Sequence, residues 1–107
     1  MYLDDLSVAM TRISEYIDGF TLEDFKKDYK TVDAVIRNFE IIGEASKNIP
    51  EIIKNKYPDI PWAEMYSLRN KISNEYFGID YEIIWDIALN YLPQNLAQIN
   101  EVIGKEK

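Results

Sequence analysis

The chain has 107 residues, of which 47% are hydrophobic, and this size suits a single compact domain over residues 1–107. Its 12 basic and 19 acidic residues give a formal net charge of -7, which disfavours broad, non-specific attraction to nucleic acid or anionic membranes. The absence of cysteine and histidine excludes disulfide scaffolds, Cys/His zinc sites, thiol nucleophiles and Ser-His-Asp hydrolysis.

The N-terminal residues do not resemble a targeting segment. Asp4 and Asp5 place acid where a signal peptide needs basic residues, and no uncharged apolar run approaches the roughly 20 residues that span a bilayer. We therefore expect a cytoplasmic protein that makes no membrane contact.

The first half of the chain reads as three helices. Apolar residues in residues 3–17 step by three and four, which predicts an amphipathic helix that ends at Asp18 and Gly19. Thr21 begins a short helix, with Asp24 as its capping-box partner. Thr31 is expected to cap a third helix, which runs to the break at residues 48–50.

The second half continues in the same pattern. After a short turn of helix at residues 51–57, the prolines of residues 57–61 impose an extended connection, and Pro61 suits the first turn of a helix that stops at Gly78. Asp80 can cap the next helix, which Pro93 should kink or end before a last apolar stripe. No segment alternates like a strand, so we expect an all-α, four-to-five-helix up-down bundle.

The densest polar and aromatic stretch is Leu-Arg-Asn-Lys-Ile-Ser-Asn-Glu-Tyr-Phe-Gly at residues 68–78. It resembles the catalytic motif of the HepT-like branch of the HEPN superfamily, in which arginine and a polar residue precede histidine, one further residue and tyrosine. Arg69, Asn70 and Tyr76 match this pattern, whereas Asn74 stands where the family has histidine. The order and spacing of further blocks also resemble the family, at residues 33–45, 56–62, 76–80 and 84–85.

This resemblance implies an α-helical homodimer that is the toxin of a type VII HEPN/MNT toxin–antitoxin system. Such toxins cleave RNA without a metal ion or other cofactor, in a cleft at the dimer interface. Their partner is an MNT-type nucleotidyltransferase antitoxin, which silences the nuclease by transferring AMP to the motif tyrosine. The candidate catalytic residues are accordingly Arg69, Asn74 and Tyr76, and Tyr76 is also the expected site of O-AMP-tyrosine.

Position 74 is where this chain departs from the family. Cleavage by the 2′-hydroxyl needs a group that moves protons and a cation that stabilises the phosphorane, roles that suit imidazole and guanidinium. The amide of Asn74 cannot transfer a proton near neutral pH, and losing such a group typically costs on the order of 10² to 10⁴ in rate. We expect a weakened nuclease, either because the activity has decayed naturally or because the residue was changed deliberately.

Helical geometry adds one constraint on the motif. On a straight helix with about 100° per residue, Arg69 and Asn74 point roughly 140° apart, whereas Arg69 and Tyr76 are nearly in line. The helix must therefore end or distort near position 74, or a second subunit must complete the site.

Other interpretations remain open for these residues. Arg69 could be a surface arginine paired with Glu64 or Glu75, and Arg37 could pair with Asp33 or Glu40 on a polar helix face. Two other functions compete with the nuclease. One is a non-catalytic, nucleotidyltransferase-binding subunit that accepts AMP or binds nucleotide, and the other is a helical subunit that binds a small molecule.

Overall fold

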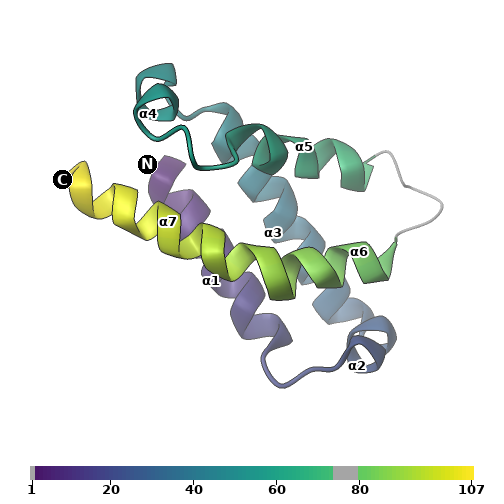
Figure 1. Ribbon diagram of the computed structural model, residues 1–107. Coiled ribbons are helices and arrows are strands. Elements are labelled where there is room, and N and C mark those ends of the chain that lie inside the picture. The colour runs from purple at the N-terminus through teal and green to yellow at the C-terminus, as the bar shows by residue number, and fades with distance from the viewer. Residues whose placement is uncertain (1, 74–79) are drawn as a thin grey trace.

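The computed structural model describes the backbone of residues 2–73 and 80–107 and the side chains in these ranges except those of residues 69–73. Its elements are the helices α1 (Tyr2–Ile17), α2 (Leu22–Lys27), α3 (Tyr29–Lys47), α4 (Glu51–Lys56), α5 (Trp62–Ser73) and α6 (Tyr81–Asp86), the π-helix η1 (Ile87–Tyr91), and α7 (Leu92–Lys105) (Figure 1). No strand occurs in the ranges described.

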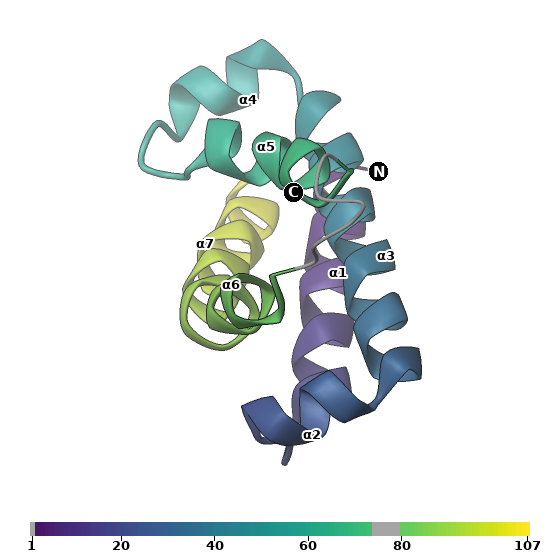
Figure 2. The ribbon, with the colours of Figure 1, turned by 90° about the vertical axis from the view of Figure 1, so that its right-hand side faces the viewer.

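The helices form a bundle around α3. This helix packs against both α1 and α5, while α7 lies along the other side of α1 (Figures 1 and 2). The α1 and α3 helices run in opposite directions, and the short α2 connects them at one end of the molecule (Figure 1). The expected all-α, up-down bundle is therefore confirmed.

The predicted apolar stripes form the core. Leu6, Met10 and Ile13 of α1 are fully buried, and Phe39 and Ile42 of α3 are equally inaccessible to solvent. Burial of each such side chain contributes roughly 1.5 to 3 kcal/mol, so the stripes provide the main favourable free energy of folding.

Two helix boundaries near residue 20 follow the predictions. Gly19 has a φ of +79°, a left-handed conformation that glycine adopts without steric cost after α1. In α2, the Thr21 hydroxyl accepts a hydrogen bond from Asp24 N at 3.1 Å, and Thr21 N donates to Asp24 Oδ2 at 3.0 Å. The predicted capping box is confirmed.

The predicted cap of α3 is wrong. Asp28, not Thr31, is the N-cap, and its Oδ1 accepts a hydrogen bond from Thr31 N at 3.2 Å. The Thr31 hydroxyl donates to the second carboxylate oxygen of Asp28 at 3.0 Å. An aspartate three positions earlier competes successfully for the cap because its charge also favours the positive end of the helix dipole.

The final quarter of the chain is one rod built of α6, η1 and α7 (Figure 1). Asp80 caps α6 as predicted, since its Oδ1 accepts hydrogen bonds from Glu82 N and Ile83 N, both at 3.1 Å. Pro93 does not end the helix, contrary to one expectation; the irregularity is the π-helix of the preceding turn, where Leu92 N donates to Ile87 O. The wider turn accommodates a proline that offers no N–H and would crowd the carbonyl four residues earlier.

Polar side chains join the end of α7 to the end of α4. Glu106 Oε2 accepts hydrogen bonds from Lys56 Nζ at 2.8 Å and from Tyr57 Oη at 2.6 Å. These contacts connect the C-terminal turn to the segment that precedes α5.

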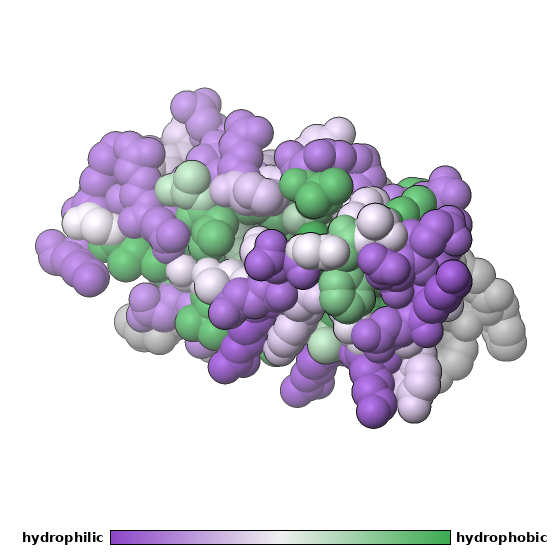
Figure 3. Space-filling model, turned by 90° about the horizontal axis from the view of Figure 1, so that it is seen from below, coloured by the Kyte–Doolittle hydropathy of each residue, from purple (hydrophilic) through white to green (hydrophobic). Residues whose placement is uncertain are grey.

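The surface seen from below is mainly hydrophilic, with apolar residues scattered in small groups (Figure 3). Among the described helices, none is both long and apolar enough to cross a membrane.

Candidate functional site

The candidate motif begins on α5 and continues beyond it. Arg69 lies in the C-terminal half of α5, directly after the buried Leu68. Asn74 and Tyr76 lie outside the described residues, as do Gly78 and the side chain of Arg69. Two expectations concern these same residues and remain predictions. One is the change in helix geometry near position 74, and the other is the alternative pairing of Arg69 with Glu64 or Glu75.

The start of α5 is held firmly on the bundle. Trp62 is almost completely buried, and its indole Nε1 donates to the carbonyl oxygen of Tyr57 at 3.0 Å. Met65 and Leu68, one and two turns further on, are buried in the core. Because these anchors share one face of α5, they fix the direction in which the helix carries Arg69.

On the other side of the motif, the chain returns at Asp80. This residue caps α6, and Trp85 of α6 packs against Phe25 with 5.4 Å between the ring centroids. Tyr81, the first residue of α6, makes an edge-on contact with the same phenylalanine at 6.4 Å. Both ends of segment 74–79 are thus attached to helices that the core positions.

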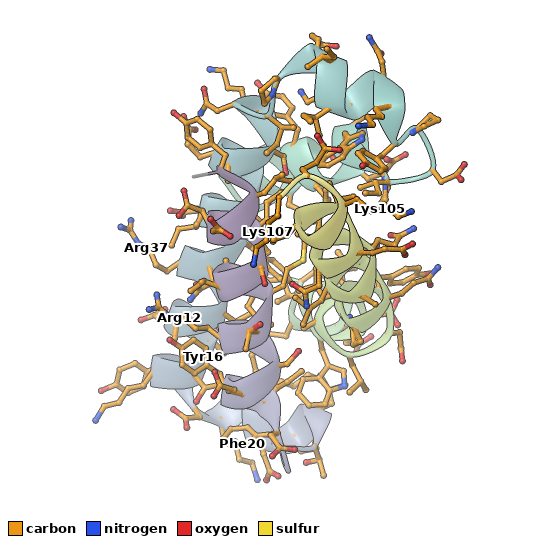
Figure 4. All side chains as sticks on the ribbon, turned by 90° about the vertical axis from the view of Figure 1, so that its left-hand side faces the viewer. Arg12, Tyr16, Phe20, Arg37, Lys105 and Lys107 are labelled. Atoms are coloured by element: carbon orange, nitrogen blue, oxygen red, sulfur yellow. The ribbon has the colours of Figure 1, made fainter. Side chains whose placement is uncertain are left out.

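Two exposed arginines lie on a different part of the surface. Arg12 on α1 and Arg37 on α3 project outward from the same side of the bundle (Figure 4). Within the described residues Arg37 makes no ion pair, so the interpretation that pairs it with Asp33 or Glu40 is wrong. An exposed pair gains little free energy, which explains why the side chain extends into solvent instead.

The sequence alone gives no signal for Arg12. A single arginine on a helix has no distinguishing pattern, and only the packing of α1 against α3 puts Arg12 on the same side as Arg37 (Figure 4). In the ranges that the structure covers, no three His, Cys, Asp or Glu residues gather as a metal site would require.

The comparison with protein families identifies the class. The family model described as ribonuclease HepT-like matches residues 6–102, which include the bundle and the whole motif from Arg69 to Tyr76. The chain belongs to this family, the HepT-like branch of the HEPN superfamily.

Individual relatives agree with this assignment. The chain is 48% identical over 102 residues to a Methanocaldococcus jannaschii protein named "Putative RNase MJ0127", with 95% of this chain and 84% of that protein covered. It is 46% identical over 92 residues to the "Probable ribonuclease HepT" of Thermococcus cleftensis, with 86% and 84% covered. No solved structure matches the chain.

Proposed function

We propose that this chain is the toxin of a type VII HEPN/MNT toxin–antitoxin pair, a metal-independent RNA endonuclease weakened by Asn74. The observation that carries the proposal is the family match over residues 6–102, because this range includes all the motif positions from Arg69 to Tyr76. The names of the relatives, which refer to ribonucleases, support the same reaction class.

The residue roles follow from the chemistry of RNA cleavage. The guanidinium of Arg69 would bind the scissile phosphate and stabilise the charge that develops on its oxygens. Asn74 could donate a hydrogen bond to the phosphate, but an amide cannot take the proton of the 2′-hydroxyl or return one to the leaving oxygen. The reaction therefore lacks its proton-transfer group in this chain.

Regulation and assembly complete the proposal. Two copies would pair around a shared cleft, so that both motifs face one RNA strand. The partner, an MNT-type nucleotidyltransferase antitoxin, would attach AMP to Tyr76. The added phosphodiester would place negative charge where an RNA phosphate should bind, and so would exclude the substrate.

The test restores the missing group. We expect Asn74→His to raise the rate of single-stranded RNA cleavage in the presence of EDTA by about 10² to 10⁴. Adding Arg69→Ala to this variant should remove the gain. The matched control is Asn55→His, which adds a histidine on the exposed surface of α4.

Equal cleavage by Asn74→His and Asn55→His would contradict a catalytic role for position 74. Circular dichroism must give the same helix content for all variants, so that a misfolded chain is not taken for an inactive one. Sedimentation at micromolar concentration should give a dimer, and a monomer would contradict the shared cleft.

Asn74 itself favours a second candidate function. A chain without an acid–base group could serve only as a non-catalytic subunit that binds the nucleotidyltransferase and accepts AMP at Tyr76. Expression of the Asn74→His variant separates the two functions, because only a nuclease should become toxic to the host when the histidine is present.

A further inference from the structure

A groove of about 620 Å³ lies between α5 and the rod formed by α6, η1 and α7. We call it the acidic groove. Its floor is apolar, since Met65, Leu68 and Leu92 line it from the edge of the core. Ile83 and Tyr91 line its open side and are 44% and 57% exposed. Large apolar side chains that remain accessible in a groove are typical of a protein-binding surface.

The charges on the described lining of the acidic groove all have one sign. Glu64 stands on the α5 wall and Asp86 on the opposite wall, and both side chains are exposed. No lysine or arginine of the described residues lines the groove, and neither carboxylate forms an ion pair there. Within the described residues, the side-chain partner of Asp86 is neutral, because Asn90 Nδ2 donates to its Oδ1 at 2.6 Å.

The shape of one wall depends on the π-helix. Ile87 and Tyr91 are the first and last residues of η1, and both line the groove. Single π turns inside α-helices occur frequently at functional sites, where the wider turn changes the direction of a side chain. The backbone irregularity thus coincides with the accessible apolar surface.

From these features we infer that the acidic groove binds a basic amphipathic helix of a partner protein. The apolar face of such a helix would lie on Met65, Leu68 and Leu92, and its flanking lysines or arginines would meet Glu64 and Asp86. The wall from Ile83 to Asn95 is about 18 Å long, which matches roughly three turns of a bound helix. Helices bind grooves in this way through apolar residues spaced three and four apart.

Charge separates this occupant from two others. A polynucleotide would bring phosphates against two carboxylates that no cation of the described lining compensates, which is unfavourable. A second copy that presented its own acidic groove here would set carboxylates against carboxylates, which is also unfavourable.

The probe is a fluorescent 14-residue peptide with leucines at helical spacing of three and four and lysines beside them. Its partner probe replaces every lysine with glutamate. Fluorescence anisotropy with the full chain should give a Kd at least tenfold lower for the lysine peptide, and this difference should diminish at high salt.

Variants locate the binding. Glu64→Lys and Asp86→Lys should each weaken binding of the lysine peptide severalfold. The control Glu15→Lys, which changes the net charge equally at an exposed position of α1, should not. Ile83→Ser should also weaken binding. Its control is Ile52→Ser, which removes an exposed isoleucine of α4 outside the groove.

Four results would overturn the inference. The two peptides could bind equally well, or Glu15→Lys could weaken binding as much as Glu64→Lys, which would indicate attraction to net charge alone. A change in the sedimentation of the chain alone on Ile83→Ser would assign the groove to a second copy. Tighter binding of a 14-nucleotide RNA than of the lysine peptide, lost in Ile83→Ser, would assign it to nucleic acid.

Discussion

The Tyr57 hydroxyl donates a hydrogen bond of 2.6 Å to Glu106, a residue 49 positions further along the chain. The same carboxylate accepts from Lys56, and these two hydrogen bonds hold the pKa of Glu106 below its ordinary value. In return, Glu106 raises the pKa of Lys56 and of Tyr57. These hydrogen bonds connect the end of α4 to the end of α7.

Because the folded state lowers the pKa of Glu106, its contribution is present above the ordinary glutamate value of about 4.3 and is lost as pH falls through the folded value. We expect Glu106→Gln to lower Tm at pH 7 and to have little effect near pH 2.

On the alkaline side, the raised pKa values mean that stabilisation through Lys56 and Tyr57 disappears above about pH 10. Thermal unfolding followed by circular dichroism tests this, with Glu15→Gln as control; a difference that is independent of pH would contradict it.

Tyr76 is the residue that the partner should modify. Incubation with the cognate nucleotidyltransferase and ATP should add the mass of AMP to the chain, and Tyr76→Phe should abolish the addition. Tyr81→Phe is the matched control, since Tyr81 is a partly exposed tyrosine at the start of α6. Labelling that persists in Tyr76→Phe and disappears in Tyr81→Phe would move the modification to the other tyrosine.

Asn38 is a polar residue inside the bundle. It is 4% exposed, and its Nδ2 donates to Ala34 O at 2.9 Å, whereas its Oδ1 is buried with no hydrogen-bond partner among the described residues. Asn38→Leu should leave the free energy of unfolding within about 1 kcal/mol of the parent or raise it, because the unpaired acceptor disappears. Asn38→Asp should lower it by about 1 to 3 kcal/mol or more, because a charge is buried instead.

Urea denaturation measures both substitutions of Asn38. The exposed Asn55→Asp is the control and should change little. If Asn38→Leu destabilised the chain more than Asn38→Asp, the oxygen would have an essential partner and the interpretation would be wrong.

Phe25 connects α2 to α6. It is fully buried and contacts the rings of Tyr81 and Trp85. Phe25→Ala should lower the free energy of unfolding by about 3 to 5 kcal/mol and should shift the fluorescence of Trp85. The exposed Tyr29→Ala, a neighbouring aromatic substitution, should cost far less; equal costs would indicate that this contact contributes little.

The helices could be predicted because a helix that buries one face needs apolar residues three or four positions apart, and this spacing is visible in the sequence. The apolar steps of residues 3–17 gave α1, and the side chain of Asp80 gave the start of α6. The cap of α3 was not predictable in the same way, because Asp28 and Thr31 both have suitable oxygens and only the backbone path selects between them.

The same distinction between local sequence patterns and long-range packing applies to the candidate site. The motif from Arg69 to Tyr76 could be recognised in the sequence because its residues are close together. The acidic groove could not, since Glu64 and Asp86 come from separate helices and nothing in their local sequence relates them. The π-helix was missed because Pro93 predicts a disturbance but not its kind.

The π-helix also determines how the chain tolerates changes in length. A five-residue turn holds one residue more than the α-helical pattern on either side, and so sets the rotation of α7 relative to α6. Deleting one residue from Ile87–Tyr91 would restore a regular α-helix and leave α7 close to its present rotation, because the wider turn has absorbed that extra residue. Ile99 and Val102 would then keep their places in the core. Deleting one residue from the regular helix on either side would instead turn everything downstream by about 100° about the helix axis and misalign the contacts of α7.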